Sequence, residues 1–358
     1  MQIPTVDLED LAGASPREEA AAAIREGFGN FGLIYVKNHG IDQEALEALF
    51  ALYATLTSWS DERKRPLSGD DIWFQRGWTP PNTERAVVAG GQPDFKECYF
   101  AAPVPGDPIC KIHYPQIYAD NIWPDGLPGF AERYEEVGRA LQAAGEVLLR
   151  GSAVALGLSE EAFVEPVQGG PHVFRLLRYL PLDEAQIAAG VLWGEEHTDF
   201  NLLTLLPGGR FLDPEGRRCA RPDDHSGLHL RTRPSEEHPR GQKVRGVAPP
   251  GCIVAQVGQQ LEILTGGTFL ATPHVVTAPS TPGYSRLSAA HFVHLHSHQR
   301  VFPLAPFQSP EALAAYSPPV LAGTYSIKTL VDIGLAPPSA IDRLGYRHYD
   351  RLAALRRE

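Results

Sequence analysis

Apolar residues in the first half of the chain recur at the spacing of amphipathic helices. The clearest pattern lies between residues 130 and 156, where Val137, Leu141, Ala144 and Leu148 share one stripe and charged residues occupy the opposite face. Similar patterns predict helices over residues 43–59 and before the turn at residues 27–32. This part of the chain is therefore predicted to contain these helices, a short extended piece at residues 3–7 and a strand at residues 33–36, with strands and long loops over residues 67–128.

From residue 172 to about residue 302 the apolar pattern changes to short runs separated by glycine and proline, which is typical of strands. Helix and loop return after Ser309 and continue to a predicted helix at residues 349–356. These patterns predict a β core with helices around it, which belongs to the α+β (mainly β) class. For the core we expect a double-stranded β-helix, or jelly-roll barrel. The predicted strands of this core are Val173–Tyr179, Leu202–Leu206, Leu228–Thr232, Ile253–Val257 and Leu287–Leu295.

One large β-rich domain can account for all 358 residues, because single domains of this size are common. Within it we expect an N-terminal helix and strand region over residues 1–125, a jelly-roll core over residues 170–303 and C-terminal helices over residues 304–358. The charged, proline-rich stretch at residues 213–245 is predicted to contain an added loop.

Composition excludes several classes of protein. A formal net charge of -11 argues against nucleic-acid binding, because such a chain cannot neutralise a phosphate backbone. The sequence has neither a membrane-spanning apolar run nor a signal peptide at its start, so we expect a cytoplasmic protein that acts on small molecules. Oligomeric state is not fixed by the sequence, and we favour a monomer. The four dispersed cysteines are interpreted as free thiols, without sequence support for a zinc knuckle.

His197 and Asp199 form a His-x-Asp pair that could bind a metal ion. In a strand the two side chains would point to the same face, and a third ligand would come from a neighbouring strand. The pair alone is weak evidence, but His274 starts a later apolar run between two turns. Two histidines and one carboxylate can hold ferrous iron and leave its opposite face open.

Arg286 and Ser288 follow shortly after His274 and would share one face of the next strand. A guanidinium can hold a carboxylate through two parallel hydrogen bonds, and the hydroxyl group can add a third. Because an arginine inside a small barrel is costly without an anion, the pair predicts a site for a dicarboxylate co-substrate.

Seven segments together give the chain a specific resemblance. The chain resembles the 2-oxoglutarate/iron(II)-dependent oxygenases of the isopenicillin N synthase type over most of its length. Residues 3–8 and 32–41 resemble the N-terminal part of that family, and residues 94–97 resemble its middle. Its catalytic half is resembled by four segments: residues 197–199, 256–258, 271–276 and 286–288.

This resemblance implies that His197, Asp199 and His274 bind iron(II), and that Arg286 and Ser288 hold the distal carboxylate of 2-oxoglutarate. Tyr179 matches a tyrosine that touches the same carboxylate in many members. Oxygen would be the second co-substrate. One departure is Leu177, which stands where many plant relatives have an asparagine that contacts the keto acid.

The implied activity is hydroxylation, desaturation or cyclisation of a small, secondary metabolite, with release of succinate and CO2. One alternative is an iron oxidase of the same fold that does not use 2-oxoglutarate as a co-substrate, as in isopenicillin N synthase, or one that forms ethylene. Another alternative is a non-catalytic ligand sensor. The measured ratio of succinate formed to substrate consumed would separate the enzymatic alternatives.

Residues that would contact the substrate are less clearly marked. Phe200 and Asn201 directly follow the metal pair, while Arg76, Trp78 and Lys96 lie in an irregular region that borders the barrel mouth in this family.

A histidine-rich stretch at residues 291–298 resembles a second metal site at first sight. Because the predicted strand ends there, we interpret its histidines as polar residues at the exit from the core. Alternation would place His294, His296 and His298 on the face of Arg286. A contact of His294 or His296 with a polar substrate is the alternative.

Overall fold

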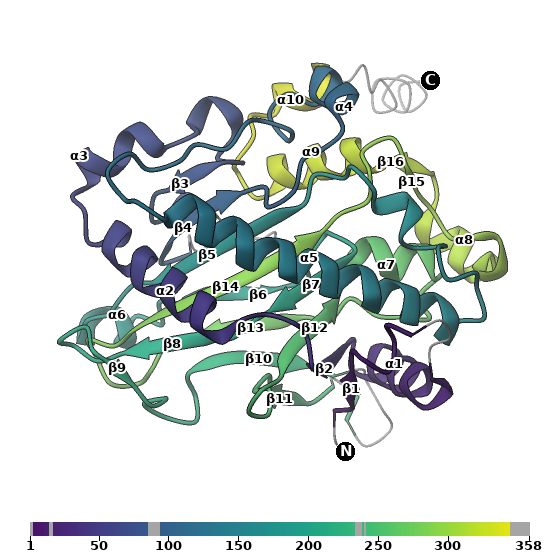
Figure 1. Ribbon diagram of the computed structural model, residues 1–358, viewed down its shortest axis with the longest axis horizontal. Helices are drawn as coiled ribbons and strands as arrows, with labels where there is room; N and C mark the ends of the chain where they lie inside the picture. The colour runs from purple at the N-terminus through teal and green to yellow at the C-terminus, as the bar shows by residue number, and fades with distance from the viewer. Residues whose placement is uncertain (1–2, 14–16, 85–93, 233–237, 240, 344–358) are drawn as a thin grey trace, which may run out of the picture.

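The computed structural model describes residues 3–13, 17–84, 94–232, 238–239 and 241–343. Within these residues, two β-sheets face each other and long helices cover the larger sheet (Figure 1). The predicted helix at residues 349–356 lies outside the described part of the chain. The prediction of a mainly β jelly-roll core flanked by helices is confirmed.

The larger sheet has the order β1-β2-β12-β7-β14-β5-β4-β3, and β8 continues the edge of β14 beyond β7. Its strands are β1 (Thr5–Asp7), β2 (Leu33–Lys37), β3 (Gly77–Thr79), β4 (Lys96–Ala101), β5 (Val173–Tyr179), β7 (Leu203–Leu206), β8 (Gly209–Leu212), β9 (Arg218–Cys219), β12 (Ile253–Val257) and β14 (Ser285–Val293).

The smaller sheet has the order β11-β10-β13-β6. Its strands are β6 (Gly194–His197), β10 (Gly227–Arg231), β11 (Lys243–Arg245) and β13 (His274–Thr277). Two of these strands, β10 and β11, come from residues 213–245, so this stretch supplies a wall of the barrel as well as connecting loops. A separate two-stranded ribbon joins β15 (Arg300–Val301) to β16 (Val320–Leu321).

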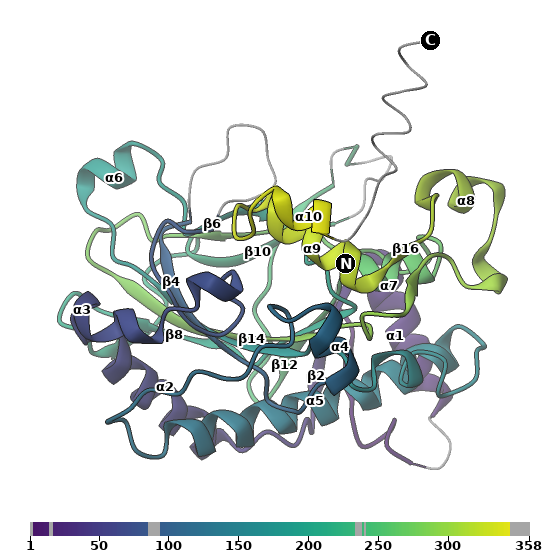
Figure 2. The same ribbon diagram turned by 90° about the horizontal axis from the view of Figure 1, so that it is seen from above.

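Helices α1 (Glu18–Asn30), α2 (Gln43–Thr57) and α5 (Phe130–Ala155) cover the outer face of the larger sheet (Figure 2). The buried stripe of α5 includes Val137, Leu141 and Leu148, as the apolar spacing predicts. The remaining helices are α3 (Asp61–Lys64), α4 (Pro108–His113), α6 (Glu184–Ala188), α7 (Gln259–Leu264), α8 (Pro310–Tyr316), α9 (Ala322–Asp332) and α10 (Ser339–Arg343).

Helices α9 and α10 lie on the other side of the larger sheet from α5 (Figure 2). Residues from α9 pack with α4 in an apolar cluster that includes Cys110, Tyr114, Ile327 and Leu330. A second cluster fills the space between the two sheets and includes Tyr179, Trp193, Leu228 and Val276 among its members. Apolar side chains from both sheets therefore fill part of the space inside the barrel.

Candidate active site

Strand pairing brings two of the predicted metal ligands together. His197 ends β6 and His274 begins β13, and the two residues are direct partners in the antiparallel register. Their ring centroids lie 4.3 Å apart. The Nδ1 atoms lie 2.7 Å from the carbonyl oxygen of Glu195 and 3.2 Å from that of Thr272. When each Nδ1–H donates to its carbonyl, both Nε2 lone pairs are free to bind a cation.

Asp199 completes the group from outside the strand. One of its carboxylate oxygens, Oδ1, lies 3.7 Å from Nε2 of His197 and 3.8 Å from Nε2 of His274. The prediction that the His-x-Asp pair lies within one strand is wrong, because β6 ends at His197. The carboxylate reaches the two rings through the turn that follows the strand, so strand alternation does not explain its position.

Hydrogen bonds fix the carboxylate of Asp199 in this turn. Its second oxygen, Oδ2, accepts from Thr204 Oγ1 at 2.7 Å and from Gln256 Nε2 at 2.6 Å, which leaves Oδ1 facing the histidines. The backbone NH of Gln259 also donates to the carbonyl of Asp199 at 2.7 Å. A Cβ atom at Gly258 would lie 2.1 Å from the carbonyl oxygen of Asn201, so this close approach requires glycine.

The electrostatic surroundings keep these groups available for a cation. The enclosed position and the neighbouring His274 ring lower the pKa of His197 to about 4. Burial alone would raise the pKa of Asp199, but the two histidines and the hydrogen bonds from Thr204 and Gln256 outweigh it and lower this pKa. At neutral pH His197 is therefore neutral and Asp199 is ionised, as metal binding requires.

Arg286 lies in β14 and pairs with no carboxylate in the part of the chain that the structure describes. Its guanidinium carbon lies 5.6 Å from the ring centre of Tyr179 and 5.8 Å from that of Phe211. None of the ion pairs formed within the described ranges includes Arg286, and burial followed by the nearby Arg221 and Arg210 lowers its pKa. The charge of a largely enclosed guanidinium among aromatic rings and other cations is unfavourable, and an anionic ligand would neutralise it.

The backbone around Arg286 is shaped to receive the guanidinium. A Cβ atom at Gly209 would lie 2.8 Å from Nη2 of Arg286, so the side chain rests against bare backbone. Ser288 is buried two residues along the same strand, and therefore on the same face. Tyr179 is the direct strand partner of Arg286, and Leu177 is that of Ser288. The three residues predicted to hold the keto acid thus lie on adjacent strands.

Two family profiles match separate parts of the chain. The profile described as non-haem dioxygenase in morphine synthesis N-terminal matches residues 3–126, and the profile of the 2OG-Fe(II) oxygenase superfamily matches residues 174–295. Together they cover more than half of the sequence, and the second contains the His197, Asp199, His274 and Arg286 positions. The chain belongs to the 2OG-Fe(II) oxygenase superfamily.

Relatives of this oxygenase span most of its length. It is 28% identical to azadirone synthase of Melia azedarach over 72% of this chain and 73% of the relative. It is 27% identical to kihadalactone A synthase of Citrus sinensis over 90% of this chain and 91% of the relative. A solved structure of a Neurospora crassa protein, in complex with alpha-KG and 5-formyluracil, has a TM-score of 0.72 and 24% identity, covering 92% of this chain and 95% of the other.

These findings confirm the predicted family, the enzymatic class and the cofactors iron(II), 2-oxoglutarate and O2. The oxygenase is an iron(II)- and 2-oxoglutarate-dependent enzyme of the isopenicillin N synthase-like group. Among the described residues, no helix is both long and apolar enough to cross a membrane.

A cavity of about 400 Å³ opens beside the metal-ligand group. His197 and Asp199 contribute to its wall, and α9 closes one side with Thr329 and Leu330, together with Ile333 directly after the helix. Its volume is in the range of cavities that bind small molecules. Apolar side chains from the larger sheet, from the turn after β6 and from the segment after α9 make up much of the remaining wall: Phe100, Val173, Phe200, Phe292 and Leu335.

Four of the six predicted substrate residues line this cavity: Lys96, Phe200, Asn201 and His294. Arg76 and Trp78 do not line it. Arg76 is buried and donates hydrogen bonds to the carbonyls of Gln75 and Ile117, and Trp78 donates from Nε1 to Glu97. These hydrogen bonds direct both side chains toward other parts of the protein, and the buried Nε of Arg76 has no hydrogen-bond partner among the described residues.

Lys96 belongs to a buried charge network that the sequence did not indicate. Its ammonium pairs with Asp94 and, at 3.1 Å, with Glu84, while Arg175 pairs with the same Glu84 carboxylate. All four residues line the cavity. Two cations face two carboxylates, so this wall of the cavity carries no net charge.

Gln256 was part of a motif in the sequence but was assigned no function. The structure shows it holding Asp199, and its Nε2 also lies 3.5 Å from Nδ1 of His274. A signal was present in the sequence, because Gln256 is the one polar side chain in β12, whose five residues are all buried. A polar side chain in such a strand needs a buried partner.

We expect Gln256→Leu to weaken iron(II) binding by roughly 10- to 100-fold, because residues that orient metal ligands typically contribute this much. The apparent iron requirement of turnover and iron binding by calorimetry would both measure it. Gln299→Leu, at an exposed position, is the matched control. Wild-type iron affinity in Gln256→Leu would contradict the positioning role.

Glu84→Gln is expected to destabilise the protein by about 3 kcal/mol at neutral pH, because two buried cations lose a shared partner. Burial alone would raise the pKa of Glu84, but Arg175 and Lys96 lower it from 4.5 to about 2. The stabilisation is therefore complete above pH 4.5 and disappears as the pH falls toward 2. Urea unfolding should show that the difference in unfolding free energy between Glu84→Gln and the wild type becomes smaller as the pH falls through this range. The exposed control Glu160→Gln should have the same unfolding free energy as the wild type throughout.

Proposed function

We propose that His197, Asp199 and His274 are the iron(II) ligands of this oxygenase. The observation that carries the proposal is the convergence of two Nε2 atoms and one carboxylate oxygen within 4.8 Å of one another. Two imidazoles and one carboxylate are the donor set that non-haem iron oxygenases use, and they leave open positions on the metal. The free Nε2 lone pairs and the fixed orientation of Asp199 fit such an ion.

Arg286, Ser288 and Tyr179 are proposed to bind the distal carboxylate of 2-oxoglutarate. The unpaired guanidinium supports this role, since its charge lacks a carboxylate among the described residues. Iron(II) and 2-oxoglutarate together supply the activation of O2 for oxidation of a C–H bond. The protein residues contribute position, because a carboxylate held at Arg286 gives the keto acid a single orientation.

The remaining residues around the site orient and protect the reacting groups. Thr204 and Gln256 keep Asp199 from turning away, and the carbonyls of Glu195 and Thr272 keep both imidazoles in one tautomer. Apolar side chains from α9 and from the larger sheet would help a bound substrate to displace water from the cavity. Such exclusion limits oxidation of anything other than the bound substrate.

The substrate is proposed to be an uncharged small metabolite with a largely apolar skeleton and a few hydrogen-bonding groups. The neutral balance of Lys96 and Arg175 against Glu84 and Asp94 disfavours a strongly anionic substrate. Phe200 and Phe292 offer apolar contact, while Asn201, Gln259 and His294 offer polar contact. Two curated relatives are named as synthases of azadirone and kihadalactone A, which supports a place in secondary metabolism.

We also propose that residues 1–358 act as one oxygenase domain, in which the N-terminal region, the core at residues 170–303 and the C-terminal helices all border the same cavity. Lys96, Asp199 and Leu330 come from these three parts and line it together. A cytoplasmic location is supported by the four cysteines, which are all free thiols.

His197→Ala and Asp199→Ala are each expected to abolish iron-dependent turnover while leaving the fold intact. Each removes one donor atom at the surface of a cavity and little buried apolar area. Succinate released per substrate oxidised, with candidate metabolites identified by mass spectrometry, measures the turnover; circular dichroism measures the fold. Substantial activity in either variant would rule out the assignment, and the exposed His225→Ala is the control.

Arg286→Leu should raise the KM for 2-oxoglutarate by about 10- to 100-fold, because a charge-assisted hydrogen-bonded pair contributes roughly 1.5–3 kcal/mol. Arg286→Lys should recover only part of the affinity, because an ammonium lacks the two parallel donors. Decarboxylation of 2-oxoglutarate at graded concentrations is the measurement, with exposed Arg217→Leu as the control. An unchanged KM would refute the role of Arg286.

A further inference from the structure

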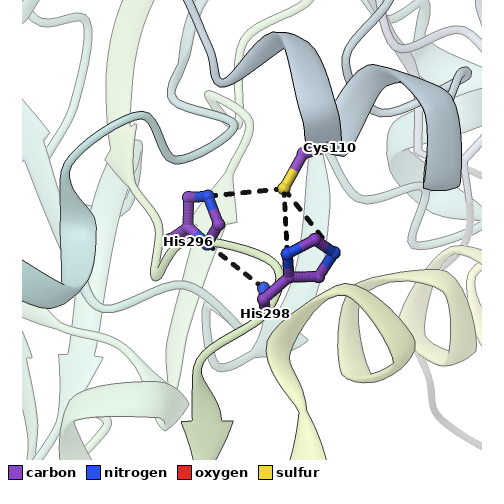
Figure 3. A group of neighbouring side chains, drawn as sticks. All are labelled: Cys110, His296 and His298. Carbon is purple, nitrogen blue, oxygen red and sulfur yellow. Dashed lines mark hydrogen bonds between the residues drawn. The ribbon is translucent and has the colours of Figure 1, made fainter.

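A second group of potential metal ligands lies away from the active site, between a short helix and the end of a strand. Cys110 comes from α4, and His296 and His298 come from the segment that follows β14 (Figure 3). The ligand atoms of these three residues all lie within 4.8 Å of one another. The histidine-rich stretch therefore does more than mark the exit of a strand from the core, because the fold brings it to a buried thiol.

The distances within this group are close to those of a zinc site. Sγ of Cys110 lies 3.4 Å from Nε2 of His296 and 3.8 Å from Nδ1 of His298. A tetrahedral zinc ion with bonds of about 2.3 Å to sulfur and 2.0–2.1 Å to nitrogen separates its ligand atoms by roughly 3.4–3.6 Å. The two sulfur–nitrogen distances are therefore within a few tenths of an ångström of this geometry, and the two nitrogens lie within 4.8 Å of each other.

Two further polar residues of α4 face the same group. Oδ2 of Asp107, the N-cap of α4, lies 3.0 Å from Nε2 of His296. The two ring nitrogens of His298 lie 3.8 and 3.9 Å from the thiol sulfur, and Nε2 also lies 3.0 Å from Nδ1 of His113, which leaves Nδ1 of His298 as the nitrogen available to a metal ion. Partners of metal-bound histidine usually contact the ring nitrogen that does not bind the metal, as His113 does for His298. Asp107 instead contacts the nitrogen of His296 that lies beside the thiol, so its carboxylate is placed as a further ligand.

Hydrogen bonds anchor the segment that carries both histidines. The backbone NH of His296 donates to the carbonyl of Pro166 at 2.8 Å, and the NH of Gly323 donates to the carbonyl of Ser297 at 3.0 Å. Tyr118 donates to the hydroxyl of Ser297 at 3.0 Å. Cys110 itself is fully buried in the cluster formed by α4, α9 and α10. The three donors are thus held in place by the fold.

We propose that Cys110, His296 and His298 form a second metal site, which binds one Zn²⁺ per chain. The donor set differs from that of the active site, since a thiolate and two imidazoles favour zinc, whereas two imidazoles and a carboxylate suit iron(II). Zinc binding replaces the thiol proton of Cys110, which is released to solvent. Asp107 offers a carboxylate beside the remaining coordination position.

This site has a structural role. It joins α4, in the N-terminal part of the chain, to the end of β14, in the core. The same α4 packs against Leu330 and Leu335, and these two residues also line the active-site cavity. Zinc at this position holds together the elements that close one wall of the cavity.

Cobalt(II) substitution in the full-length, untagged protein tests this proposal. The His197→Ala variant is used, so that the iron site is impaired, and the protein is stripped of metal and titrated with Co²⁺. We expect one equivalent of Co²⁺ to give a thiolate-to-cobalt charge-transfer band together with the visible bands of tetrahedral cobalt. Added Zn²⁺ should remove the charge-transfer band and the visible cobalt bands, because zinc binds such a site more tightly than cobalt and displaces it.

Three variants in the same background identify the ligands. Cys110→Ser should remove the charge-transfer band, and His298→Ala, at an exposed position, should weaken Co²⁺ binding at least about tenfold without disturbing the fold. The control Cys219→Ser removes a partly exposed thiol outside the group and should keep the band. In addition, Zn²⁺ should raise the Tm of the background protein and leave that of the His298→Ala variant unchanged.

The proposal is overturned if equimolar Co²⁺ produces no thiolate band, or if the band survives Cys110→Ser. Unchanged Co²⁺ affinity in His298→Ala overturns it as well, and this outcome can be read even if Cys110→Ser fails to fold. None of these measurements depends on the oxygenase reaction, so the result stands apart from the function of the active site.

Discussion

The antiparallel pairing of β6 with β13 is the constraint on which the active site depends. It sets His197 opposite His274, so that two imidazoles from residues far apart in the sequence meet at one place. Everything else at the site is arranged around this pair. The turn after β6 brings Asp199 to it, and Thr204 and Gln256 orient the carboxylate from the facing sheet. The three side chains proposed as iron ligands thus lie between the two sheets, and their arrangement depends on the packing of the sheets.

Charge is handled in two different ways within the same barrel. Lys96 and Arg175 are neutralised by Glu84 and Asp94 beside the cavity, whereas Arg286 is left without such a partner among the described residues. A partly buried cation without a partner is costly to the fold, and the anionic ligand proposed for Arg286 would supply the missing charge. The paired cations instead hold strands β4 and β5 and the chain around Glu84 together.

The sequence was sufficient to predict those parts of the molecule that follow from local periodicity. The stripe of α5 and the runs that became β5 and β12 have the predicted positions, because apolar spacing reports directly on which side of an element is buried. The position of Asp199 was predicted for the wrong reason, since it lies in a turn whose shape depends on Thr204 and Gln256. The group around Cys110 could not be found by periodicity, because α4 and the end of β14 are separated by more than 180 residues.

Strand β14 serves three purposes along a single stretch of chain. Arg286 lies near its start, Phe292 borders the cavity near its end, and His296 lies just beyond it. A one-residue insertion in the middle of this strand would slip the register, and every side chain on one part of it would turn to the opposite face. Evolution of new substrate preferences in this protein is therefore expected to spare the length of β14 and to proceed through the loops and the C-terminal helices, where insertions leave the register intact.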